Sequence, residues 1–264
     1  MKKQFLLKTL LLFSSLLLFS ACQTNKSEKT QPTEESTDMG IKKDERSQST
    51  KEELEHTTET TESTRKEFAN GSLIQAVNEK NAEKVQEILK DKDYPINEKN
   101  ERGETSLLIA THQNFIEIAK ILIDAGADIN VQDLISDSPY LYAGAQGKTE
   151  ILSYMLEKQT PDQQKVNRFG GNALIPAAEK GHLENVKLLL KDGRVEIDHQ
   201  NNYGYTALIE AVALTDGSLV YQQIVTVLLE AGADKNLRDN TGRTAEDYAK
   251  NLGYTEILKS LNAN

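Results

Sequence analysis

An internal repeat constrains the fold of this chain more than any other feature. A six-residue segment that begins with Thr, Ser or Asn and ends with Ala occurs five times, at intervals of 33 to 38 residues. The copies cover residues 105–110, 138–143, 172–177, 206–211 and 244–249, and a degenerate sixth copy ends at Ala76. A unit of this length cannot bury its own apolar face, so we expect the units to stack against one another.

Each unit has the pattern of two short helices. The Thr, Ser or Asn that begins the first segment can accept a hydrogen bond from a free N–H of the first turn. Gly147 and Gly181 can end a first helix, and apolar pairs such as Leu122/Ile123 then recur at the spacing of an amphipathic helix. We predict an all-α solenoid of about six helix–turn–helix repeats in residues 68–264, at about 69–101, 102–134, 135–168, 169–202, 203–240 and 241–264.

These motifs resemble those of the ankyrin-repeat family. The units read T-x-L-x-x-A, then G-x-x-E, and Gly-Ala-Asp-x-Asn leads to a link with Gly before the next Thr. The matching residues are Thr105, Thr206, Thr244, Gly103, Gly204, Gly242, Asn97, Asn130 and Asn236. Leu108, Leu141, Ile175 and Ile209 replace the family's His, which keeps the core apolar. The resemblance implies a module that binds proteins through its concave face and the tips of its links.

Two further features of the repeats have structural interpretations. The fifth unit carries an insertion of about five residues within 214–221, which we interpret as a longer turn. A Glu also recurs once per unit near the helix–helix turn, at Glu83, Glu117, Glu150, Glu184 and Glu256. This strict period favours helix capping over a pair of catalytic carboxylates.

The N-terminus has the layout of an export signal. Lys2 and Lys3 precede a short run, residues 9–21, that is apolar apart from Ser and Thr. Cys22, the only cysteine, follows Phe19-Ser20-Ala21, which resembles the lipobox of bacterial lipoproteins. We predict a signal peptide at 1–21 and lipidation of Cys22 that anchors the protein to the extracytoplasmic side of the cell membrane. The alternative is an ordinary signal peptide or an uncleaved anchor.

Residues 22–67 differ sharply in composition from the rest. The segment from 23 to 67 is rich in Ser, Thr, Glu and Lys, and has no aromatic residue. Such a chain cannot bury enough apolar surface to offset the entropy of ordering. We predict a disordered tether that separates the anchor from the repeats.

Charge and residue types exclude several functions. The formal net charge of −10 disfavours nucleic acid as a partner and favours a protein with a basic surface. The four histidines, His56, His112, His182 and His199, have no metal-ligand spacing, and no phosphate-binding loop or nucleophile–base motif is present. We therefore expect no enzyme, no metal and no cofactor, and a monomer.

The links between repeats supply the candidate site. The three central links carry Leu134, Ile135, Phe169 and Tyr203 at their tips, with Tyr205 adjacent, whereas the outer links are polar. A run of exposed apolar side chains is typical of an interaction surface. The alternative is that these side chains fold back and fill the space left by the missing His.

These observations support a membrane-anchored scaffold that binds a partner protein and has no catalytic role. A sharper form of this hypothesis is an inhibitor or immunity-type protein that blocks the basic site of an exported toxin or enzyme. An alternative of another class is a ligand-binding or hydrolytic lipoprotein, which requires a pocket with convergent polar groups.

Overall fold

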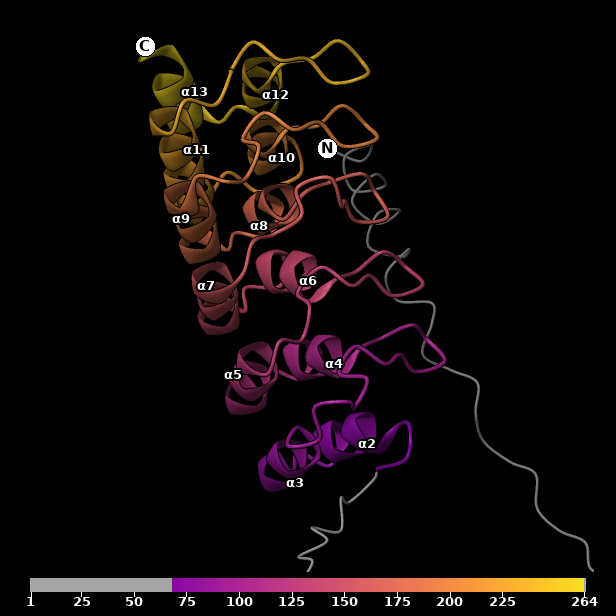
Figure 1. Ribbon diagram of the computed structural model, residues 1–264. Helices are drawn as coiled ribbons and strands as arrows, with labels where there is room; N and C mark the ends of the chain where they lie inside the picture. Colours follow the sequence, from indigo (N-terminus) through magenta and orange to yellow (C-terminus); the bar gives the residue numbers. More distant parts are fainter. Residues whose placement is uncertain (1–67, 264) are drawn as a thin grey trace, which may run out of the picture. The chain divides into compact units, whose positions relative to one another are not determined.

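The computed structural model describes residues 68–263, and over that range the chain consists of helices and loops (Figure 1). The helices are α2 (Ser72–Asn78), α3 (Ala82–Ile88), α4 (Ser106–His112), α5 (Ile116–Asp124), α6 (Pro139–Ala145), α7 (Thr149–Lys158), α8 (Leu174–Glu179), α9 (Leu183–Asp192), α10 (Ala207–Ala213), α11 (Leu219–Glu230), α12 (Ala245–Leu252) and α13 (Thr255–Asn262). Within 68–263 no strand forms, and one isolated bridge pairs Lys99 with Thr105. The all-α prediction is confirmed.

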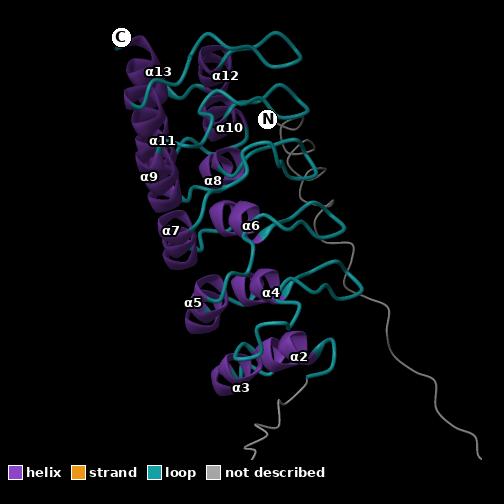
Figure 2. Cartoon of the chain, in the orientation of Figure 1, coloured by secondary structure: helices purple, strands orange, loops and turns teal. Residues whose placement is uncertain are grey.

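The helices pair in sequence order and stack as two rows. Helix α4 packs on its partner α5 and on α2 and α6, while α5 packs on α3 and α7. Figure 2 shows the inner row, formed by the even-numbered helices, between the outer row and the loops. The repeated loops all leave the inner row on the same side, so equivalent loop residues become neighbours in space.

The inner helices begin with the side-chain capping bonds that the sequence predicts. Thr105, Ser138, Thr206 and Thr244 each accept a 3.2 Å hydrogen bond from the backbone N–H three residues later. At α8 the Oδ1 of Asn172 accepts from the N–H groups of Leu174 and Ile175. Each bond satisfies a donor that the helix itself leaves free.

One apolar core connects the repeats. It contains a buried Leu from most units, including Leu107, Leu152, Leu174 and Leu208. The four residues that replace the His of the repeat motif, Leu108, Leu141, Ile175 and Ile209, are also buried. Leu141, Ile175 and Ile209 belong to this same core.

Two interpretations from the sequence need correction. The insertion in the fifth unit is only partly a turn, because its last residues, from Leu219, form the first turn of α11. The recurrent Glu residues lie in the first turns of outer helices, yet their side chains cap nothing. Glu184 and Glu256 pair with Lys187 and Lys259 of the same helix, and an acid in a first turn also suits the helix dipole.

The predicted signal peptide, Cys22 and the tether lie outside the described residues. Between residues 68 and 263, no helix combines the length and the apolar character needed to cross a lipid bilayer.

Candidate interaction surface

Five loop segments share one conformation. We call residues 100–104, 133–137, 167–171, 201–205 and 239–243 tips 1 to 5. In every tip the backbone N–H of the first residue donates to the carbonyl of the fifth over 2.9–3.0 Å. The first residue is Asn or Asp, and its Oδ1 accepts from the N–H groups of the third and fifth residues over 2.8–3.0 Å. The tips are therefore fixed by their own short-range bonds.

The fourth residue of each tip completes the turn. It has a left-handed backbone, with φ between 66° and 82°, at Gly103, Ser136, Gly170, Gly204 and Gly242. Glycine adopts this conformation without steric cost, which explains why four of the five tips use it.

The third residue of every tip has an exposed side chain. In tips 2, 3 and 4 this residue is Ile135, Phe169 and Tyr203, which are 52%, 48% and 57% exposed. Leu134, the second residue of tip 2, is 76% exposed. These four predicted site residues are thus exposed in three consecutive repeats, and they do not fold back to replace the missing His.

Tyr205 differs from the other predicted site residues. It is half-buried against the core, and its hydroxyl lies 3.2 Å from the hydroxyl of Tyr248. Burial and then the hydrogen bond to Tyr248 raise its pKa. The Tyr248 hydroxyl donates in turn to Asp239, the first residue of tip 5. Tyr205 is therefore linked to tip 5 through the hydroxyl of Tyr248.

Charged groups of tip 1 contact one another and the end of α4. The Nε and Nη2 atoms of Arg102 contact Oε2 of Glu104 over 2.7 and 2.6 Å, and Nδ1 of His112 lies 3.3 Å from Oε1 of the same carboxylate. Burial opposes ionisation of Glu104, but hydrogen bonds from Asn100 and Arg102 outweigh it and lower its pKa. Burial lowers the pKa of His112, whose ring packs on Tyr142 with 4.1 Å between centroids.

A second group of charges lies further along the same row. Glu210 of α10 is buried, and its pKa rises to about 8 because of burial and of the nearby charge of Glu179. Burial also raises the pKa of Glu179, against the attraction of Lys180. Sequence analysis missed these residues, although a Glu inside the apolar segment from Thr206 to Ala211 is a visible signal.

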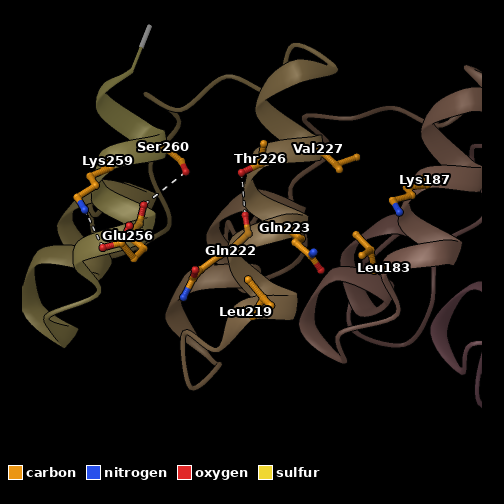
Figure 3. Close-up of a pocket in the computed structure, with 10 residues that line it drawn as sticks. All are labelled: Leu183, Lys187, Leu219, Gln222, Gln223, Thr226, Val227, Glu256, Lys259 and Ser260. Carbon is orange, nitrogen blue, oxygen red and sulfur yellow. Dashed lines mark hydrogen bonds and ion pairs between the residues drawn. The ribbon is translucent and has the colours of Figure 1, made fainter.

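The outer row carries a shallow open groove between α9, α11 and α13. Its lining includes Leu219, which is 66% exposed. Figure 3 shows Lys259 bonded to Glu256 and the Thr226 hydroxyl bonded to the carbonyl of Gln222, each within one helix. Within residues 68–263 no cluster of three or more His, Cys, Asp and Glu residues could hold a metal.

Paired helices in two rows, linked by loops of one repeated conformation, define a repeat protein of the ankyrin class. The chain belongs to this family, since the family model described as ankyrin repeats in three copies matches residues 61–133 and 140–239. Ankyrin repeats are scaffolds for protein–protein interaction and are generally non-catalytic.

Known proteins resemble this chain over most of the repeat region. The ankyrin repeat protein YahD of Escherichia coli (strain K12) is 39% identical over 166 residues, which cover 63% of this chain and 82% of YahD. The crystal structure of the ankyrin repeat protein EF0377 shares 62% identity and a TM-score of 0.73, covering 74% of this chain and 98% of that one. An ankyrin repeat domain from Acinetobacter baumannii AYE shares 46% identity and a TM-score of 0.71 over the same fractions.

Proposed function

We propose that this protein is a non-catalytic scaffold, held on the extracytoplasmic face of the membrane, that binds a partner protein through tips 2 to 4. The observation that carries the proposal is the run of exposed apolar side chains at Leu134, Ile135, Phe169 and Tyr203. Exposed aromatic and aliphatic side chains gathered on one surface are typical of the centre of a protein interface.

The rigidity of the tips supports this proposal. Each tip is closed by its own hydrogen bonds, so its side chains are held in place before a partner arrives. Binding to an ordered surface loses less conformational entropy than binding to a loop that must first order. The polar third residues of the outer tips, Arg102 and Thr241, suit the rim of such an interface.

The membrane anchor rests on the sequence before the repeats. Cys22 follows Phe19-Ser20-Ala21 at the end of the apolar run, and two or three acyl chains on this residue would hold the protein stably on a membrane. A Cys22→Ser variant tests the anchor. We expect it to lose incorporation of labelled palmitate and to leave the membrane fraction, and retention of both would contradict lipidation.

The excess of acidic residues in the chain favours a second possible function, which is also protein binding. A net charge of −10 would steer a basic protein towards this chain. The scaffold would then act as an inhibitor or immunity-type protein that covers the basic site of an exported toxin or enzyme.

Crosslinking in the native envelope tests the binding surface. The full chain is compared with a variant in which Leu134, Ile135, Phe169 and Tyr203 are all changed to Ser. Both must show the same thermal unfolding, because the four side chains are exposed. A control variant carries Glu101→Ser and Asn240→Ser at the polar outer tips.

A partner captured by the wild type and the control, but not by the tip variant, supports the proposal. Identical capture by all three proteins would place the binding surface elsewhere.

A further inference from the structure

One junction between neighbouring tips differs from the others. At three junctions the N–H of the second tip residue donates to the carbonyl of the third residue of the preceding tip. These bonds are Leu134 to Arg102 at 3.1 Å, Asn202 to Phe169 at 2.9 Å and Asn240 to Tyr203 at 3.0 Å. Among the described residues, no hydrogen bond joins the equivalent N–H of Arg168 and carbonyl of Ile135.

The residue at the fourth tip position explains the difference. A Cβ atom added to Gly103 or Gly204 would lie 3.0 or 2.7 Å from the backbone nitrogen of the next tip. A Cβ atom at Gly204 would clash with the next tip, and one at Gly103 would push its neighbour away by a few tenths of an ångström, so glycine favours close docking of the tips. Ser136 occupies this position in tip 2, with φ at 66°, and already carries the Cβ atom. This Cβ atom accounts for the missing backbone hydrogen bond between tips 2 and 3.

The loops remain tied together below this junction. The side-chain amide of Gln132 donates to the carbonyl of Ser136 at 2.9 Å and to that of Val166 in the next repeat at 2.8 Å. Gln200 makes the equivalent pair of bonds, to Gly204 and Arg238, at a junction whose tips are also bonded. The difference is thus confined to the tips, and the array stays intact beneath them.

The open junction lies in the middle of the exposed apolar side chains. Ile135 stands on one side of it and Phe169 on the other, and both are about half exposed. The Arg168 guanidinium lies 5.1 Å from the centre of the Phe169 ring and 3.7 Å from Asp137, which balances its charge. The junction presents a main-chain donor, a main-chain acceptor and apolar side chains on both sides, and Arg168 is paired with Asp137.

We infer that the junction between tips 2 and 3 binds an extended, uncharged segment of the partner protein. An extended backbone offers both a carbonyl for the Arg168 N–H and an N–H for the Ile135 carbonyl, whereas a helix has already used these groups. An apolar side chain of the segment packs between Ile135 and Phe169. This inference rests on the proposed function, because it specifies how the tips take their partner.

Ser136 offers the test, because one substitution closes the junction. The probe is a phage-displayed library of linear peptides, selected on the full chain in detergent. Binding of a selected peptide is compared among the wild type, Ser136→Gly and Ser136→Ala. Ser136→Gly removes the Cβ atom and lets the tips bond to each other, so we expect affinity to fall about tenfold or more. Ser136→Ala retains the Cβ atom and should bind like the wild type.

Hydrogen exchange gives a second readout that folding defects would not mimic. The Arg168 amide should exchange more slowly when the peptide is bound to the wild type. Three results would each overturn the inference. The first is a Ser136→Gly variant that binds the peptide as tightly as the wild type, and the second is an Arg168 amide that the bound peptide does not protect from exchange. The third is a library that yields no peptide whose binding requires Ile135 and Phe169. The proposed function has a separate test. If crosslinking in the envelope still depends on the four tip side chains, the proposed function holds even when the inference about the junction fails.

Discussion

The side-chain amide of Asn201 donates a 2.8 Å hydrogen bond to Oε1 of Glu210, and both residues are buried. The Oδ1 atom of the same amide accepts from the N–H groups of Tyr203 and Tyr205. Asn201 thus joins the conformation of tip 4 to a titratable group in α10. The protonation state of Glu210 is therefore coupled, through Asn201, to the conformation of tip 4, which carries Tyr203 of the proposed binding surface.

Stability should depend on pH through Glu210. Its pKa of about 8 in the folded chain exceeds the ordinary value of 4.5, because of burial and of the charge on Glu179. Folding therefore favours the protonated carboxyl, so the stabilising contribution is complete below pH 4.5 and is lost as pH rises through 8. Glu210→Gln should remove this loss, which is on the order of a few kcal/mol between about pH 5 and about pH 9.

Chemical denaturation at the two pH values measures this effect. Glu184→Gln, at an exposed position in α9, serves as the control and should keep the pH dependence of the wild type. A Glu210→Gln variant that loses as much stability as the wild type at high pH would contradict the assignment.

The two tyrosines of tip 4 should respond differently to truncation. Tyr203→Ala removes an exposed ring and should change the free energy of unfolding by less than about 0.5 kcal/mol. Tyr205→Ala removes a half-buried ring and its contact with Tyr248, so we expect a loss of about 2 kcal/mol. Urea denaturation of both variants measures the difference, and equal losses would show that Tyr205 does not support the next tip.

Gly144→Ala should destabilise the protein although alanine usually favours a helix. The exchange gains about 1 kcal/mol of helix propensity at an average site. At Gly144 of α6, however, the new Cβ would lie 2.8 Å from the Cβ of Ala173 and 3.2 Å from its carbonyl oxygen. Separating α6 from the next repeat should cost about 1–3 kcal/mol, which outweighs the gain. Thermal unfolding provides the measurement, and a raised midpoint would show that the repeats separate at little cost.

The helix pairs could be predicted from sequence because their causes are local and repeated. Thr105, Thr206 and Thr244 each cap their own helix by accepting from the N–H three residues later, and Ser138 does the same for α6. The outward position of Ile135, Phe169 and Tyr203 follows from the same periodicity, since the third residue of each tip has the same surroundings.

Contacts between repeats could not be predicted in this way. Tyr205 carries the same aromatic signal as Tyr203, but its partner Tyr248 lies 43 residues further along the chain. The burial of Glu210 likewise depends on α8 and on Asn201, which only the stacked structure brings together. Ser136 is visible as a break in the glycine pattern, yet its effect depends on how closely the next tip approaches.

A single buried side chain, Asn185, bonds one repeat to the preceding one. Its Nδ2 donates to the carbonyls of Ala143 and Gly144 over 2.9 and 3.0 Å, and its Oδ1 accepts from the Thr149 hydroxyl over 2.6 Å. Asn185→Ala leaves these polar groups buried without partners, so we expect a loss of about 3 kcal/mol in urea denaturation.

Asn185→Asp separates hydrogen bonding from packing in the same experiment. The carboxylate keeps the shape of the amide and can still accept from Thr149, but it presents oxygen to the two carbonyls at the end of α6. It should destabilise the protein at least as much as Ala does near neutral pH, and the loss should shrink at low pH, where a protonated carboxyl can donate once. An Asp variant as stable as the wild type would show that the two donated bonds contribute little to the stacking of these repeats.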